Sequence, residues 1–200
     1  MQRFLHVGCG QAKKRDTTDA FNNDNWTEVR FDIDPAVDPD IQGTMTDLSL
    51  VESDSFDALF SSHNIEHLYA HEVDVALAEF LRVLLPGGYL VLTCPDLQSV
   101  CKLVAEDKLL DKAYMSPAGP ISPVDIIYGY RPSIASGNNF MAHKFGFTKR
   151  TLTDHLISAG FKAVACVKRD HPKFDLWAVA AKSKIDKKGL LEIAKSHFPA

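Results

Sequence analysis

Short apolar runs alternate with polar stretches along the chain, and the runs are too short to be helices. The first covers residues 4–7 and ends at Gly8 and Gly10, and the next covers residues 29–31 and ends at Asp32. Near-continuous apolar runs of this length, bounded by turn residues, are typical of buried parallel strands. We expect the other strands at residues 41–46, 56–61, 89–93, 163–167 and 176–181.

Apolar residues recur at helical spacing in longer stretches, each of which predicts a helix. The helix that opens at Thr148 has a good N-cap residue and is closed by Gly160. Residues 11–27 are polar instead, so we expect a loop there with at most a short helix. The predicted helices cover residues 65–84, 97–110, 148–159 and 187–197.

The order of these elements predicts an α/β fold in which helices cover both faces of a mostly parallel sheet. The last two strands are joined by the turn at residues 170–172, so we expect that pair to be antiparallel. We expect one domain over residues 1–182, followed by a C-terminal helix within residues 183–200.

Residues 113–147 interrupt the pattern with prolines, glycines and aromatic residues. A long irregular segment inside a compact domain is usually functional. We therefore expect a lid-like insertion here that closes over a substrate.

Composition narrows the class of protein. With 200 residues and 46% apolar content the chain is able to bury a full core, and its formal charge of −4 gives no electrostatic footprint for nucleic acid. The four cysteines never form a CxxC pair, which favours reduced thiols. The first strand begins at once and no apolar run reaches a membrane span, so we expect a cytoplasmic protein without a membrane partner.

Two features predict a nucleoside site. Gly8 and Gly10 end the first strand and allow the backbone to approach a ligand closely, and Asp32 ends the second strand. A glycine turn after one strand and an acid after the next are the usual arrangement for binding the phosphate or sugar side of a nucleotide. Here the acid is expected to hold a ribose.

These motifs continue along the chain in a characteristic order. They are Val7-Gly8-Cys9-Gly10, Phe31-Asp32-Ile33-Asp34-Pro35, Asp47-Leu48, Ser55-Phe56-Asp57, Ile65-Glu66-His67, residues 82–88 and Gly160-Phe161. In this order the chain resembles the class I S-adenosylmethionine-dependent methyltransferases, near their type 11 small-molecule group. The resemblance implies a Rossmann-like fold, a seven-stranded sheet with an antiparallel last strand, S-adenosylmethionine as cofactor and a small-molecule methyl acceptor.

The resemblance also implies roles for individual residues. Residues 7–10 (Val7, Gly8, Cys9 and Gly10) would pack beside the methionine part of the cofactor, and Asp32, next to Ile33, would bind both ribose hydroxyls. Asp47 would accept a hydrogen bond from the adenine amino group, with the backbone N–H of Leu48 beside it. Ser62 and His63 would line the pocket of the sulfonium.

Two departures from the family pattern stand out. Ala12 replaces the third glycine, which predicts a shortened first crossover helix. Residues 61–64 read Ser-Ser-His-Asn and differ from the motif of the amino-methylating DNA enzymes, which argues against a nucleobase amine as acceptor.

Methyl transfer is an in-line displacement in which the enzyme mainly positions the reactants and excludes water. A general base is useful when the acceptor is a hydroxyl. Our candidates are His63, at a strand end where α/β proteins bind ligands, and His143, which follows the tyrosine-rich insertion. Alternatively, His63 only lines the cofactor pocket without transferring a proton, and His143 only anchors the lid.

A metal is not part of the expected site, but a competing interpretation exists. Residues 63–67 form an HxxEH pattern, which in inverzincins binds zinc. Some RNA-end and quinone-pathway methyltransferases resemble this stretch and bind a divalent metal through Glu-x-x-Glu-His; here His63 replaces the first glutamate, and His143 is the residue available to complete a site. Metal-assisted O-methylation therefore stays open as an alternative, whereas a metalloprotease is disfavoured by the nucleoside motifs.

Two further classes compete with an active methyltransferase. A degenerate member of the fold would serve as a binding or regulatory protein, and the missing third glycine favours that view while Asp32 and Asp47 oppose it. A nicotinamide-dependent oxidoreductase fits the glycine turn and Asp32, but it fits Asp47 and the antiparallel last strand poorly. The sequence leaves the acceptor atom and the oligomeric state open.

Overall fold

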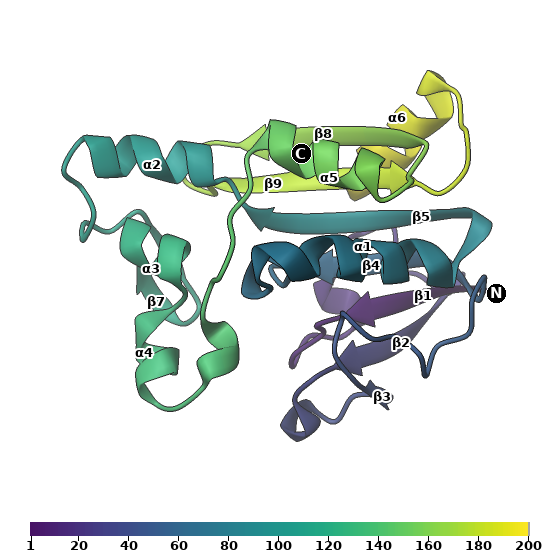
Figure 1. Cartoon of the computed structure of the whole chain (residues 1–200), viewed down its shortest axis with the longest axis horizontal. Helices are drawn as coiled ribbons and strands as arrows, with labels where there is room; N and C mark the ends of the chain where they lie inside the picture. Colours follow the sequence, from purple (N-terminus) through teal and green to yellow (C-terminus); the bar gives the residue numbers. More distant parts are fainter. Residues whose placement is uncertain (200) are drawn as a thin grey trace.

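The computed structural model describes residues 1–199, and its centre is a seven-stranded sheet with the order β3-β2-β1-β4-β5-β9-β8 (Figure 1). Strands β1 to β5 are parallel, and β9 is antiparallel to both of its neighbours. This confirms the predicted sheet and its antiparallel last strand. The strands are β1 (Gln2–Val7), β2 (Trp26–Asp32), β3 (Ile41–Gln42), β4 (Phe56–Ser62), β5 (Leu84–Pro95), β8 (Ala163–Arg169) and β9 (Asp175–Ala181).

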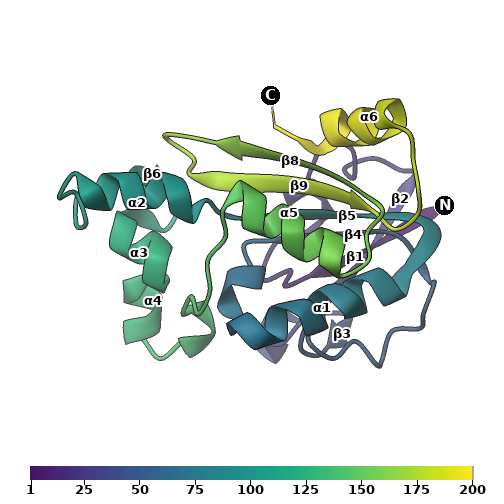
Figure 2. The same cartoon turned by 45° about the horizontal axis from the view of Figure 1, so that its top comes forward.

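Helices cover both faces of the sheet. Helices α1 (Ala70–Val83) and α5 (Lys149–Ser158) pack on one face, and α6 (Lys187–His197) packs on the other (Figure 2). Successive residues of a strand point to opposite faces, so Leu5 joins the core under α1 while Phe4 joins the core under α6. Within residues 1–199, no helix has the length and apolar character that crossing a bilayer would require.

No α-helix connects β1 to β2, as the polar sequence of residues 11–27 predicts. This segment contains one short 3₁₀ helix, η1 (Lys14–Asp16). The buried guanidinium of Arg30 holds the segment to the sheet by donating to the carbonyls of Gly10 and Ala12, at 2.5 and 3.3 Å. Phe21 anchors its far end by stacking on Phe4, with ring centroids 4.3 Å apart.

The helix predicted over residues 65–84 is broken in two. A 3₁₀ helix, η3 (Ile65–His67), is followed by an extended Leu68, and α1 begins only at Ala70. The carboxylate of Glu72 accepts the N–H of Tyr69 at 2.7 Å and so starts the second helix afresh. Strand β5 begins earlier than predicted, and residues 85–88 form a bulge opposite Asp57 in β4.

Residues 97–147 form a lobe that lies beyond the carboxyl ends of the parallel strands (Figure 1). The segment predicted as a long loop is partly regular, because Pro123 and Pro132 each lie in the first turn of a short helix. A small apolar cluster holds the lobe together and joins it to the sheet, because Val100, Ile121 and Ile126 of the lobe pack with Phe174, which directly precedes β9. Its elements are α2 (Leu97–Ala105), β6 (Tyr114–Ser116), β7 (Gly119–Ile121), α3 (Pro123–Tyr128), α4 (Arg131–Ala135) and η4 (Asn139–Met141).

Candidate functional site

A cavity of about 480 Å³ opens at the carboxyl ends of β1, β2 and β4, where a parallel sheet usually binds its ligand. Gly8 and Gly10, with φ of +67° and +51°, turn the chain sharply out of β1 and leave bare backbone along the wall. The structure brings seven of the residues predicted for the cofactor to this cavity: Val7, Gly8, Gly10, Asp32, Ile33, Ser62 and His63.

Asp32 lies at the end of β2 with its side chain on the cavity wall, and the residue is 8% exposed. Its carboxylate accepts the backbone N–H of Gly10 at 2.7 Å and that of Asp34 at 2.9 Å. These bonds fix the carboxylate and couple it to the glycine turn. A carboxylate has about four acceptor positions, so about two remain for a ligand.

Asn64 joins the ends of β1 and β4, a role that the sequence did not reveal. Its side-chain amide donates to the carbonyls of Val7, Gly8 and Ser62 at 3.1, 3.2 and 2.9 Å. The amide lies where a side chain at Gly8 would stand, because an added Cβ would come within 2.2 Å of it. Gly8 is therefore required both by its backbone angle and by Asn64.

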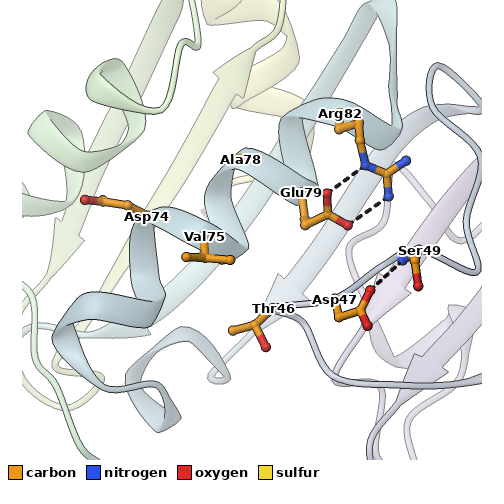
Figure 3. A pocket seen from close by; sticks show the side chains of 8 residues that line it. All are labelled: Thr46, Asp47, Ser49, Asp74, Val75, Ala78, Glu79 and Arg82. Atoms are coloured by element: carbon orange, nitrogen blue, oxygen red, sulfur yellow. Dashed lines mark hydrogen bonds and ion pairs between the residues drawn. The ribbon is translucent and has the colours of Figure 1, made fainter.

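Three residues predicted for the cofactor do not line this cavity. Cys9 is buried beside it, and burial raises the pKa of its thiol to about 11, so the thiol is protonated. Asp47 lines a separate open groove beside α1 (Figure 3), where its exposed carboxylate accepts the N–H of Ser49 at 3.0 Å. The N–H of Leu48 is already donated to Glu79, at 2.8 Å.

The cavity is lined by Gly43, Thr44 and Met45, and not by Asp47 and Leu48. Gly43 is required because an added Cβ would stand 2.6 Å from the ring of Phe31. A glycine directly after a short strand often marks a place where another group comes close to the backbone, and the sequence contains this signal at Gly43.

The lobe closes the opposite wall of the cavity. Asn138, Phe140, Met141 and Lys144 line it, and the ammonium group of Lys144 lies 4.7 Å from the ring centroid of Tyr69. The aromatic content of the insertion predicted a covering role, but not which of its residues reach the cavity.

A second, smaller cavity of about 150 Å³ lies between the sheet and the lobe. His63, His67 and Met141 line both cavities, whereas Glu66 and His143 line only the smaller one. The two histidines predicted as bases therefore occupy neighbouring positions, with His63 at the junction and His143 deeper under the lobe.

The charges in the smaller cavity favour an ionised glutamate and a neutral His143. Burial opposes the charge of Glu66, but the imidazole of His63, 3.5 Å away, outweighs it and lowers the pKa of that carboxyl. The same contact outweighs desolvation and raises the pKa of His63 above its ordinary value. Desolvation lowers the pKa of His143, which keeps its imidazole uncharged near neutral pH.

In a comparison with known families, residues 5–92 fit a family model described as a methyltransferase domain. This span runs from β1 into β5 and includes the glycine turn, Asp32 and the segment with His63 and Glu66. No curated protein sequence matches the chain significantly.

Solved structures resemble the whole chain at low sequence identity. One is an S-adenosylmethionine-dependent methyltransferase from Thermotoga maritima, described as a possible histamine N-methyltransferase. It is 16% identical to this chain with a TM-score of 0.59, and the match covers 91% of this chain and 82% of that one. A S-adenosylmethionine-dependent methyltransferase from Methanosarcina mazei is 16% identical with a TM-score of 0.58, over 92% and 93%.

A third structure contains ligands. It is the 1,6-didemethyltoxoflavin-N1-methyltransferase of Burkholderia thailandensis with bound 1,6-didemethyltoxoflavin and S-adenosylhomocysteine, 14% identical with a TM-score of 0.57, over 92% of this chain and 72% of that one. Some matched chains are much longer, and this chain spans as little as 47% of them. At these identities the likeness shows the fold.

Proposed function

We propose that this chain, whose residues 5–92 fit a methyltransferase-domain model and whose fold is that of the class I S-adenosylmethionine-dependent methyltransferases, transfers a methyl group to a small-molecule acceptor. S-adenosylmethionine is the cofactor, and when bound it supplies the activated methyl group on a sulfonium. A small-molecule acceptor is supported by the second cavity beside the larger one and by the similar structure that contains a bound small molecule.

The observation that carries the proposal is the position of Asp32 on the wall of the larger cavity. The carboxylate is buried, is fixed by two backbone N–H groups and keeps acceptor positions for a pair of hydroxyls. The cavity of about 480 Å³ lies within the roughly 300–1,000 Å³ of small-molecule sites. The residues present therefore fit a nucleoside.

The remaining cavity residues suggest how the ligand is oriented. The backbone of residues 7–10 would face the methionine part, and Ser62 and His63 would lie near the sulfonium. Ile33 and Met45 offer apolar surface for the adenine ring. Asp47 and Leu48 lie outside this cavity, so the adenine contact predicted for them requires a test.

His63 is the residue that we propose as general base, because it lines both cavities and so faces the cofactor and the acceptor together. His143 lies on the acceptor side alone. The lobe would close over both cavities through Met141 and exclude water from the reaction.

Calorimetry with S-adenosylmethionine and S-adenosylhomocysteine tests the proposal. We expect both ligands to bind the wild-type chain, and Asp32→Asn to weaken binding by about 10- to 100-fold, since hydrogen bonds to a charged group contribute roughly 1.5–3 kcal/mol. Asp24→Asn is the matched control, because Asp24 is exposed and lies on the loop between β1 and β2.

The outcomes separate the proposed function from its main rival. If neither ligand binds, the chain is a degenerate member of the fold that serves as a binding or regulatory protein. The loop in place of the first crossover helix is the observation that favours this rival. Binding together with turnover of a panel of small-molecule acceptors supports the enzyme.

A further inference from the structure

The carboxylate of Glu66 is buried without a partner. The residue is 1% exposed, and among residues 1–199 neither carboxylate oxygen has a hydrogen-bond partner. Burying an ionised carboxylate without compensation costs several kcal/mol, so native proteins pair such groups or use them as metal ligands. The nearest basic atom is Nδ1 of His63, 3.5 Å away, which is too far for a good hydrogen bond.

Two imidazoles share the space in front of this carboxylate. Glu66, His67 and His143 each offer a ligand atom, and these atoms all lie within 4.8 Å of one another. The two histidine rings meet edge to face with centroids 4.8 Å apart. This spacing suits three ligands around one ion.

Both rings are held in one orientation by the backbone. Nδ1 of His67 lies 3.1 Å from the carbonyl oxygen of Ala142, and Nδ1 of His143 lies 2.8 Å from that of Ile126. Because a carbonyl only accepts, each Nδ1 carries a hydrogen, so in the neutral ring each Nε2 keeps its lone pair. Metal-binding histidines are oriented and polarised by this kind of bond.

We propose that Glu66, His67 and His143 bind one divalent transition-metal ion at the boundary between the sheet and the lobe. Two neutral imidazoles and one carboxylate form a ligand set that suits Zn²⁺, Fe²⁺ or Mn²⁺. Three protein ligands leave coordination positions open, and the second cavity lies beside them. The ion supplies the positive charge that the carboxylate lacks.

The backbone around the site is built to keep the ligands together. Glu66 and His67 belong to η3, and His143 belongs to the segment that leaves the lobe. The N–H groups of Lys144 and Phe145 both donate to the carbonyl of Glu66, at 2.8 and 3.2 Å. The ion would therefore fasten the lobe to the sheet at a point that the backbone already joins.

An ion pair with a histidine does not by itself explain how the buried carboxylate of Glu66 is stabilised. His63 faces Glu66, but its side chain is 47% exposed and its Nδ1 comes within 3.5 Å of only one of the two carboxylate oxygens. One cation between the three groups satisfies all of them at once.

Metal analysis of the untagged chain is the test. The protein is produced in medium supplemented with zinc, iron and manganese, and bound metal is measured by mass spectrometry. The metal-free chain is then titrated with Co²⁺, whose visible absorption reports coordination by nitrogen and oxygen. We expect about one ion per chain, and Glu66→Gln and His143→Gln to weaken Co²⁺ binding by at least about 100-fold.

The control is His71→Gln, which removes an exposed histidine outside the cluster and should bind Co²⁺ like the wild type. Circular dichroism shows whether each variant folds, and His67→Gln replaces Glu66→Gln if the latter does not. The proposal is overturned if the wild type binds no Co²⁺ tighter than about 100 µM, or if the cluster variants bind it as the wild type does, which would indicate an adventitious ion only. Calorimetry with S-adenosylmethionine on the metal-free chain tests the proposed function separately.

Discussion

At the scale of single residues, Gly8 and Asn64 lie in close contact on the wall of the cavity. Gly8 has a positive φ, and a Cβ there would overlap the side-chain amide of Asn64. We expect Gly8→Ala to destabilise the fold by about 2 kcal/mol or more, because backbone strain and steric overlap add. Chemical denaturation measures the change.

A double variant separates these two causes. Asn64→Gly removes the amide, so in that background Gly8→Ala should cost only the strain of its backbone angle. We expect the added cost to fall by about 1 kcal/mol or more. Equal costs in both backgrounds would show that the overlap with Asn64 is not what excludes a side chain.

Asp47 provides a second test at this scale. Its exposed carboxylate bonds to Ser49 in the groove beside α1, and that bond lowers the pKa of the carboxyl. We expect Asp47→Asn to change S-adenosylmethionine affinity by less than about twofold. Met45→Ala should weaken it about fivefold, because roughly 1 kcal/mol of apolar contact is lost. A tenfold loss in Asp47→Asn would place the adenine ring at Asp47.

At the scale of elements, strand ends were predictable and the connections between them less so. The apolar run of β1 and the acid that ends β2 placed Gly8 and Asp32 at strand ends, and both residues line the cavity because parallel strands end at a common edge. Thr44 and Met45 were not singled out because the strand was predicted to run to residue 46, whereas β3 ends at Gln42. The Asn64 side chain is oriented by its hydrogen bonds to the end of β1. These partners are far away in the sequence, so a local sequence pattern does not indicate them.

The lobe contains an ion pair in which the carboxylate is buried and the guanidinium is exposed. Asp125 is 5% exposed, and its carboxylate accepts from Nε of Arg131 at 2.7 Å and from the N–H of Ser122 at 3.0 Å. Burial opposes its charge, but Arg131 and Ser122 outweigh it and lower the pKa of Asp125 to about 2, so the carboxylate is ionised at neutral pH.

We expect Asp125→Asn to loosen the lobe without unfolding the sheet. Loss of a charged hydrogen bond costs roughly 1.5 kcal/mol or more, so limited proteolysis within residues 113–142 should become about tenfold faster. Asp111→Asn, at an exposed position of the same lobe, should be cleaved at the wild-type rate. If the global melting temperature falls instead while lobe cleavage stays unchanged, the pair supports the whole domain and not the lobe.

At the scale of the whole molecule, the C-terminal helix completes the core. Its existence was predictable from apolar spacing, but its docking was not, because the partners of α6 are far away in sequence. Leu190 and Ala194 of α6 pack with Phe4 and Phe21 from the start of the chain. The polar loop between β1 and β2 thus replaces a crossover helix on this face, and α6 covers part of the space that such a helix would fill.

His197 joins α6 to both the loop and the sheet. Its ring is 3% exposed, with Nδ1 2.7 Å from the hydroxyl of Thr18 and Nε2 3.0 Å from the hydroxyl of Tyr89. The ring also lies against Phe21, with centroids 4.4 Å apart. Burial lowers the pKa of His197 to about 4, so the folded chain holds this ring uncharged where an unfolded chain would protonate it.

Stability should therefore fall in acid, and the sign follows from the depressed pKa. Above pH 6.5 His197 is neutral in both states; between about pH 6.5 and 4 only the unfolded state binds the proton, so the free energy of unfolding decreases as the pH falls. The full shift corresponds to about 3 kcal/mol at pH 4. His197→Gln, which does not titrate, should be less stable at pH 7 and lose less stability on acidification. Urea unfolding of both chains at pH 7, 5.5 and 4 measures the difference, and parallel profiles would show that His197 is not the group that responds.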